Sequence, residues 1–180
     1  SMVGDGGANY EEPFETCIDA LINFKKPLIA AVDGTAIGGG ATILLHFDAV
    51  FISPNAKVKY PFSDLGLAPE VGSSLLLFQS LGYQKAAQLL FGAEWISGQE
   101  YFNFGMAKYL GDDYYDKAID YAHQLNEQSL ASIIETKAIL KSFNADALSA
   151  ARDLETKAMK RLYGSEDNIK AIEKFFSRKG

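Results

Sequence analysis

Two stretches of the sequence combine residue types that could stabilise and move a negative charge. The first is VDGTAIGGGATILLHFDAV, residues 32–50, in which four of the seven residues from position 34 to position 40 are glycine. Glycine costs about 0.5–1 kcal/mol relative to alanine in regular structure, so the cluster indicates a positive φ or a close backbone approach. The second is KYPFSDLGLAPEVGSSLLL, residues 59–77, which places one acid, Glu70, in an apolar setting.

The glycine turn follows a predicted strand and precedes a predicted helix. Such a turn presents unpaired N–H groups, and the positive end of a helix dipole, to an oxyanion or a phosphate. A phosphate-binding loop would need Lys after the last glycine, where this chain has Ala41, and the G-x-G-x-x-G pattern of a dinucleotide site is absent. Two interpretations of the turn alone stay open: an oxyanion hole with the N–H of Gly39 as donor, and a packing turn without a ligand.

Glu70 stands between Pro69 and Val71, directly before a Gly-Ser-Ser helix start. Burial among apolar residues raises the pKa of a carboxyl group because it disfavours the charged form. A general base that works near neutral pH needs such a shift. The alternative is an acidic side chain that complements the dipole of the helix expected at residues 73–81.

Composition limits the classes of protein that fit. The chain has 180 residues, 48% of them hydrophobic, and a formal net charge of −6, which indicates a folded domain and disfavours nucleic acid or an anionic membrane as partner. No run of 18 apolar residues predicts a membrane span. A single cysteine, Cys17, excludes a disulfide framework and favours an intracellular setting. His46 and His123 lack matching ligands, so we expect structural histidines and no metal.

The elements that must position the two stretches follow from hydrophobic periodicity. We expect a flexible segment at residues 1–12 and a helix at 13–24, and then strands at 28–32, 49–53, 57–60 and 106–110 with a helix beginning at 41–45. From Gly72 onward the period is helical, with a break at Gly82 and a capping box at Ser97 and Glu100. Four amphipathic helices are expected at residues 114–128, 129–143, 145–163 and 165–176. The sequence therefore predicts an α/β fold, with a core at residues 13–111 and a helical region at 112–180.

Together, the two stretches resemble the crotonase, or enoyl-CoA hydratase/isomerase, superfamily. The resemblance is carried by KPLIAAVDGTAIGGG at residues 26–40, FDAVFISPNAKVKYPFSDLGLAPEVGSS at 47–74, and the block at 86–105 that contains SGQE. It implies a spiral of ββα turns with a helical trimerisation region at the C-terminal end. It also implies reactions that pass through a thioester enolate held by two backbone N–H groups.

The subgroup follows from residue types at the family's catalytic positions. Hydratases carry glutamates at the positions held here by Thr42 and Phe62, so hydration of a double bond is disfavoured. The segment from Tyr60 to Glu70 is similar to peroxisomal-type Δ3,Δ2-enoyl-CoA isomerases, in which one glutamate shuttles the proton. Chromodomain-Y-like corepressors share the framework but carry Asp at the position of Glu70.

The resemblance assigns roles to particular residues of this chain. Glu70 would be the catalytic acid/base, the N–H of Gly39 an oxyanion donor, and an acyl-CoA the substrate, with no further cofactor. Further contacts implied to the substrate come from Ile37, Gly38, Phe62, Leu67 and Pro69. Phe175 and Arg178 align with positions where a C-terminal helix touches the CoA nucleotide, although a plain amphipathic helix end also explains them.

One family motif is not found. The first oxyanion donor of the family comes from an Ala/Ser-Gly-x-Asp turn upstream of KPLIAAVDG, and this chain has no such turn. We therefore expect that the chain begins just past that motif and that its turnover alone is weak or absent. Two functions stay open: an enoyl-CoA isomerase, and a non-catalytic acyl-CoA-binding or assembly module. The resemblance implies a homo-trimer or hexamer, cytoplasmic in a bacterium and peroxisomal or mitochondrial in a eukaryote.

Overall fold

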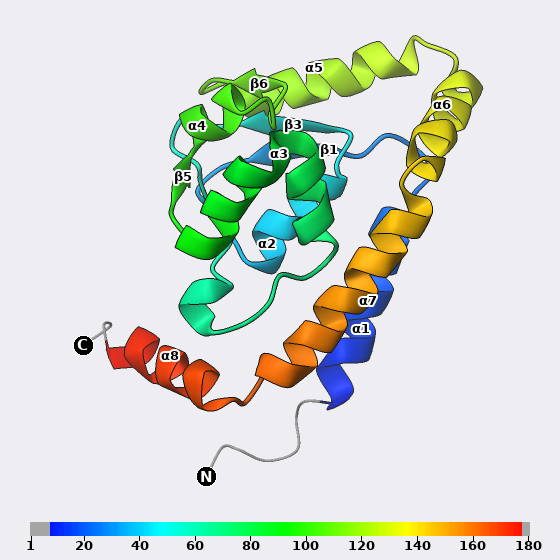
Figure 1. Ribbon diagram of the computed structural model, residues 1–180. Coiled ribbons are helices and arrows are strands. Elements are labelled where there is room, and N and C mark those ends of the chain that lie inside the picture. The colour runs from blue at the N-terminus through cyan, green and yellow to red at the C-terminus, as the bar shows by residue number, and fades with distance from the viewer. Residues whose placement is uncertain (1–7, 178–180) are drawn as a thin grey trace.

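The computed structural model describes residues 8–177, except for the side chains of residues 8–12, 175 and 176. Two small sheets and three helices form a core, the first helix of the described residues lies beside it, and the last four helices run around it (Figure 1). This confirms the α/β class. The strands are β1 (Ile29–Val32), β2 (Thr35–Ile37), β3 (Ala49–Ile52), β4 (Lys57–Lys59), β5 (Ile96–Ser97) and β6 (Tyr109–Leu110).

The helices divide into a core set and a peripheral set. The core set comprises α2 (Gly39–Thr42), α3 (Ser73–Gly92) and α4 (Gly98–Asn103), with the 3₁₀ turns η1 (Ile43–His46) and η2 (Ser63–Leu65). Helix α1 (Ala8–Ile22) precedes the core and belongs to neither set. The peripheral set comprises α5 (Tyr114–Asn126), α6 (Leu130–Ser142), α7 (Ala145–Leu162) and α8 (Glu166–Ser177).

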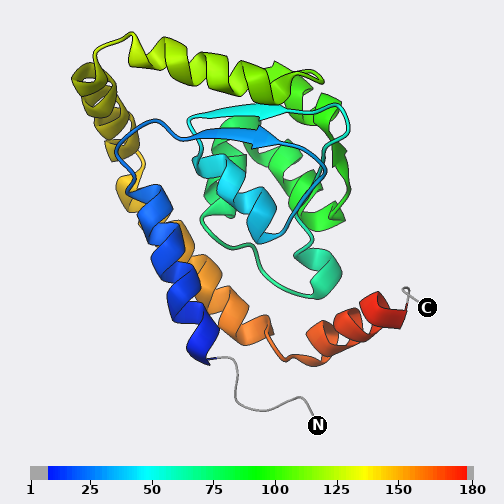
Figure 2. The same cartoon turned by 180° about the vertical axis from the view of Figure 1, so that it is seen from behind.

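Both sheets are short and mostly parallel. In the first, β3 pairs in parallel with β1 and β6, so that Ile52 lies opposite Val32 and Leu110. In the second, β4 pairs in parallel with β2 and antiparallel with β5. Parallel strands are usually covered on both faces, and here α5 lies across β1 and β3 (Figure 2). The main core packs between the sheets and α3, around Ile52, Val58 and Leu77, each 0% exposed.

Two local signals in the sequence are confirmed. Gly82 takes φ 75° and ψ 165°, so α3 is two helical segments joined at a kink, as the break at this glycine predicts. Ser97 accepts a hydrogen bond from the Glu100 N–H while the Glu100 carboxylate accepts one from the Ser97 N–H, which is the expected capping box at the start of α4.

Other boundaries differ from expectation. Helix α1 begins at Ala8 and carries Pro13 inside it, so the expected flexible segment contains part of a helix, and residues 1–7 lie outside the described residues. The helix expected after the glycine turn is only the four-residue α2, followed by the 3₁₀ turn η1. Strands β2 and β5 were not anticipated.

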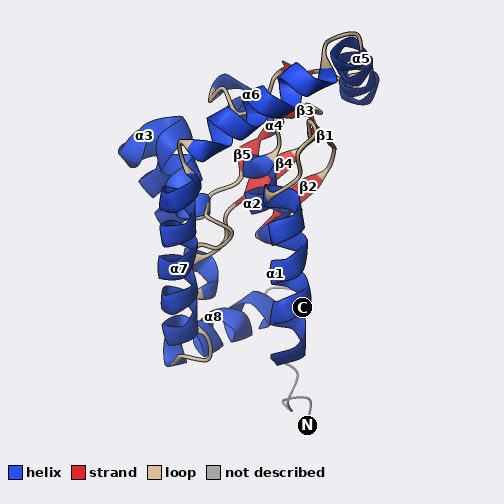
Figure 3. Ribbon diagram, turned by 90° about the vertical axis from the view of Figure 1, so that its right-hand side faces the viewer, coloured by secondary structure: helices blue, strands red, loops and turns tan. Residues whose placement is uncertain are grey.

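The peripheral helices form an arm beside the core (Figure 3). Helix α7 packs against α3, and α8 packs against η2. Arg152 of α7 forms ion pairs with Glu15 and Asp19 of α1, at 2.6 and 2.7 Å. None of the helices that the structure describes is long and apolar enough to cross a bilayer.

Candidate active site

The glycine residues form a hydrogen-bonded turn that connects β2 to α2. Gly38 takes φ 56°, its N–H donates to the Lys59 carbonyl at 3.1 Å, and its carbonyl accepts from the N–H groups of Ala41 and Thr42 at 2.9 Å. The first N–H groups of a helix have no acceptor inside the helix. Accordingly, no residue that the structure describes accepts a hydrogen bond from the N–H of Gly39. This backbone donor is unpaired, as an oxyanion hole requires.

The carboxylate of Glu70 lies against this turn. A Cβ atom built on Gly39 would stand 3.5 Å from Glu70 Oε1 and 3.8 Å from the ring of Phe14, which α1 supplies. A Cβ at position 39 would therefore be in van der Waals contact with the carboxylate. Two segments separated by strands β3 and β4 thus place an unpaired N–H donor and a carboxylate side by side.

The environment of Glu70 disfavours its charged form. Burial is the largest cause that raises the pKa of this carboxyl, and the negative charges of Glu155 and Glu15 raise it further. No residue in the described part of the chain donates a hydrogen bond to Glu70, which removes the usual cause of a lowered pKa. A half-buried carboxyl with a raised pKa is a suitable general acid/base.

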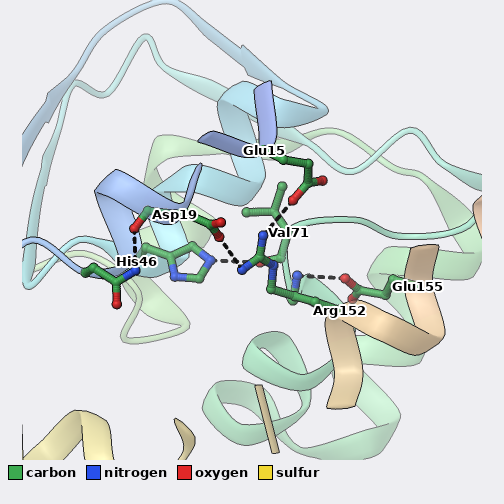
Figure 4. A network of polar contacts seen from close by, with 8 residues as sticks. Glu15, Asp19, His46, Val71, Arg152 and Glu155 are labelled. Atoms are coloured by element: carbon green, nitrogen blue, oxygen red, sulfur yellow. Dashed lines mark hydrogen bonds and ion pairs between the residues drawn. The ribbon is translucent and has the colours of Figure 1, made fainter. Parts of the chain in front are cut away.

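The loop that carries Glu70 is held by three side chains from other elements. Asn168 of α8, 2% exposed, donates to the Leu65 carbonyl at 2.6 Å. Backbone of α8 also lies close to Gly66, where a Cβ would stand 3.0 Å from Asn168 Cα. His46 and Glu155 bind the two residues that follow Glu70 (Figure 4).

The other predicted site residues fall into different environments. Ile37 is 43% exposed at the end of β2, and a Cβ on Gly38 would contact Pro61 Cγ at 3.9 Å. Leu67 and Pro69 are half-buried in the loop before Glu70. Phe62 is 4% exposed and packs in the main core, which leaves little of its surface for an acyl chain. The side chain of Phe175 and the whole of Arg178 lie outside the described residues.

The position at which hydratases carry their first catalytic glutamate is held here by a fully buried residue. Thr42 is 0% exposed, and its hydroxyl donates to the Gly39 carbonyl at 3.1 Å. The side chain therefore serves the turn itself and does not face a ligand. A hydrogen bond of this kind is typical of Thr inside a helical turn.

Three residues near the site have no signal in the sequence that marks them for it. Phe14 and Glu155 belong to patterns of helical spacing, and His46 follows the glycine turn as one polar residue in an apolar run. Their roles depend on α1, α7 and η1 meeting at one place. No periodicity within a single segment could have shown this.

In the described part of the chain, no group of three or more His, Cys, Asp or Glu residues could hold a metal ion. A cavity of about 890 Å³ lies between α1, the arm and the core, and neither Gly39 nor Glu70 lines it. Of the cations that line it, Lys137 and Arg152 are paired with acids and Lys141 donates to the Ile22 carbonyl. We therefore take the Gly39–Glu70 pair as the candidate site.

Comparisons with known proteins show which family the chain is similar to. YhaR of Bacillus subtilis (strain 168) is 30% identical over 161 residues, which is 88% of this chain and 63% of YhaR. Enoyl-CoA delta isomerase 2 of Rattus norvegicus is 29% identical over 164 residues, 90% of this chain and 42% of that protein. The solved structure of Pseudomonas aeruginosa OdaA is similar with a TM-score of 0.83 at 37% identity, over 88% of this chain and 65% of that one.

The chain thus spans less than two thirds of the length of each of these three proteins. The expected crotonase fold is confirmed by the solved relatives. A family model described as enoyl-CoA hydratase/isomerase matches residues 3–180, nearly the whole sequence. The chain therefore belongs to the enoyl-CoA hydratase/isomerase family.

Proposed function

We propose that this protein binds an acyl-CoA thioester and moves a 3-enoyl double bond to the 2-trans position. The observation that carries the proposal is the contact distance of 3.5 Å between Glu70 Oε1 and a Cβ position on Gly39. A base beside the residue that carries an unpaired N–H donor can act with that donor on one small group at the same time. The similarity to a rat enoyl-CoA delta isomerase supports the same reaction class.

In the proposed mechanism Glu70 shuttles one proton. Its carboxylate removes the C2 proton of the 3-enoyl thioester, and the electron pair moves into an enolate whose oxygen gains negative charge. The N–H of Gly39 donates to that oxygen more strongly as the charge develops, so it lowers the barrier. The protonated Glu70 then returns the proton to C4, and the double bond ends between C2 and C3.

The raised pKa of Glu70 suits both halves of this cycle. A carboxylate of ordinary basicity is a weak base towards carbon, and a raised pKa makes it a stronger one, while the protonated group can still transfer its proton to the far more basic carbanion. Burial raises the pKa of Glu70 in the direction of neutral pH, so the group can serve in turn as base and as acid. The short helix α2 contributes little dipole, so its end N–H groups carry the oxyanion interaction.

The test compares the purified chain with Glu70→Gln on a 3-enoyl-CoA, following the absorbance of the conjugated product. We expect kcat to fall about 10²–10⁴-fold, which is the usual contribution of general acid/base catalysis, while binding of a saturated acyl-CoA changes little. Glu94→Gln, at an exposed acid, serves as the matched control. A substrate labelled with deuterium at C2 should deliver part of its label to C4, because one base handles both carbons.

A second candidate is a non-catalytic acyl-CoA-binding or assembly module. It is favoured by one observation: within residues 8–177, no strand precedes β1 to present a second backbone donor opposite Gly39. Acyl-CoA binding without turnover would support this candidate, and turnover that Glu70→Gln leaves unchanged would reject the isomerase.

A homo-trimer or hexamer is the proposed assembly. Large apolar side chains of the arm are strongly exposed in the single chain, among them Leu140 (64%), Leu154 (66%) and Phe143 (77%). Soluble monomers rarely leave such side chains uncovered in one region. Contacts with further copies of the chain would cover them.

A further inference from the structure

We propose that His46 and Glu155 are positioning residues that clamp the Val71–Gly72 peptide from both ends and so hold Glu70 against Gly39. This inference rests on the proposed function, because it assigns how the base of that reaction is oriented. Neither residue would touch the substrate. Both would act through the backbone of the loop.

The clamp closes on a single amide group. His46 Nε2 lies 2.8 Å from the Val71 carbonyl oxygen, and the Gly72 N–H donates to Glu155 Oε2 at 2.7 Å (Figure 4). The Val71 carbonyl and the Gly72 N–H belong to the same peptide unit, which follows Glu70 by one residue. A peptide unit bonded at both its oxygen and its nitrogen cannot rotate without breaking two hydrogen bonds.

The two side chains come from opposite sides of the loop. His46 ends η1, the turn that continues directly from the glycine turn and α2, whereas Glu155 lies in α7 of the arm. The clamp therefore ties the segment of the base to the segment of the oxyanion donor. It also ties both segments to a helix more than 80 residues further along the chain.

The backbone at this point needs such support. Val71 has φ 61°, a left-handed conformation that is strongly disfavoured for a β-branched residue, and Gly72 follows with φ 75°. A residue held in such a region is strained and persists only where its surroundings over-determine it. A Cβ on Gly72 would also stand 2.3 Å from Leu148 Cδ1, so α7 packs closely on the turn.

Glu155 replaces the local cap that α3 lacks. The N-cap residue of α3 is Gly72, which has no side chain, and Glu155 instead accepts from Gly72 N–H, Ser74 N–H at 2.8 Å and Ser74 Oγ at 2.5 Å. An acidic side chain at a helix N-terminus is favoured by the helix dipole. The three donors hold a buried negative charge, and this charge is the second cause, after burial, of the raised pKa of Glu70.

His46 acts as the donor in its own contact. A carbonyl oxygen can only accept, so Nε2 must carry a hydrogen. Burial lowers the pKa of His46, the hydrogen bond to Val71 opposes that change, and the charges of Lys141 and Arg152 lower the pKa further. The neutral imidazole is thus favoured, with its Nε2–H directed at the loop.

The helix that carries Glu155 is itself anchored. Arg152, one turn earlier in α7, donates to Asp19 at 2.7 Å and to Glu15 at 2.6 Å, both on α1 (Figure 4). The same helix α1 supplies Phe14 beside Gly39. The charged groups that face Glu70 are therefore Glu155 from α7 and Glu15 from α1, as its pKa also indicates.

Nuclear magnetic resonance on the full chain tests the clamp without requiring turnover. In the parent, we expect the Gly72 amide to exchange slowly and the Gly39 amide shift to follow the titration of the Glu70 carboxyl, which Glu70→Gln identifies. Glu155→Gln should speed Gly72 exchange at least tenfold and lower the pKa of Glu70. Asp153→Asn, which removes the same charge two residues away on an exposed position of α7, should do neither.

The other end of the clamp is tested by His46→Leu and His46→Gln. Leu removes the donor, so the Gly39 amide should cease to follow Glu70, while Gln supplies an N–H at a similar reach and should restore the coupling. In a catalytically active protein, Glu155→Gln and His46→Leu should lower kcat at least tenfold and change KM less than threefold.

The outcomes separate the two proposals. Fast Gly72 exchange in the parent, or a Glu70 titration identical in Glu155→Gln and Asp153→Asn, would overturn the clamp even if Glu70→Gln abolishes turnover. Turnover that survives Glu70→Gln would instead overturn the proposed function, while the titration and exchange data would still decide whether the clamp exists.

Discussion

The core and the last three helices of the arm, α6 to α8, use opposite kinds of buried residue. In the core, the side chains with no exposed surface are mainly apolar, such as Ile52, Val58 and Leu77. In α6 to α8, the only side chains buried among those that the structure describes are polar or charged, one in each helix: Lys137, Glu155 and Asn168. The core is therefore held by apolar burial and α6 to α8 are attached by hydrogen bonds and charge, whereas α5, the first helix of the arm, packs on the core through the buried Ala118.

Each of these three residues binds a loop of the core. Lys137 donates to the Lys26 carbonyl at 2.7 Å and pairs with Asp48 at 2.6 Å, next to the start of β1. Asn168 binds the Leu65 carbonyl, and Glu155 binds the N-terminus of α3. Such bonds add little net stability but need correct geometry, and breaking one leaves a buried group without a partner. The arm thus fixes where the loops of the candidate site lie.

The largest predicted effect is a matched pair of Leu→Ala substitutions. Leu77→Ala, at a fully buried position of α3, should lower the free energy of unfolding by about 2–5 kcal/mol through lost burial and a cavity. Leu154→Ala, at a position of α7 that is 66% exposed, should change it by less than about 0.5 kcal/mol in the single chain. Urea unfolding measures both.

Protein concentration sharpens this first comparison. If copies of the chain cover the arm, the cost of Leu154→Ala should grow with concentration, because association stabilises the folded state by mass action. A large cost at every concentration would contradict the division, since it would mean that the arm is held by apolar burial within one chain.

Asn168→Ala should have an intermediate effect. The substitution leaves the Leu65 carbonyl and the Gly164 N–H without their side-chain partner, at a site 2% exposed, and should cost about 1–3 kcal/mol. Hydrogen exchange of the Leu65 and Leu67 amides should accelerate as the loop loosens. Asn126→Ala, at an exposed helix end, is the control, and equal effects of the two substitutions would show that α8 does not hold the loop.

Much of the fold could be predicted from periodicity and turn residues. The four arm helices, the kink at Gly82 and the Ser97 capping box each have a signal within a few neighbouring residues. Strands β2 and β5 have three and two residues, too few to show an alternation. The expected helix after the glycine turn was too long because an apolar run cannot distinguish α from 3₁₀ geometry.

The candidate site was predictable only in part, and for a related reason. Gly39 and Glu70 carry unusual residue types for their surroundings, so each could be found from its own segment. The clamp could not, because Glu155 is 83 residues from Gly72 and looks like any acid of an amphipathic helix. For Phe62 the prediction and the structure differ: its position in the family indicated a wall of the acyl pocket, whereas its side chain packs in the main core.

The smallest predicted effect contrasts the two carboxylates that meet where the arm joins the core. Glu70 accepts no hydrogen bond from the described residues, whereas Glu155 accepts three. Since burial raises the pKa of Glu70, the folded state holds its proton more tightly than the unfolded chain does. This group therefore stabilises the fold below pH about 4 and loses that contribution as pH rises through its raised pKa.

Gln in place of each glutamate should then change stability in opposite directions at neutral pH. Glu70→Gln cannot ionise, so it should be more stable than the parent at pH 7 and nearly equal to it at pH 4. Glu155→Gln should be less stable at pH 7, because three donors lose a charged acceptor. Urea midpoints at both pH values measure this. Destabilisation by Glu70→Gln at pH 7 would mean that Glu70 is a paired structural acid, and the distinction between the two carboxylates would fail.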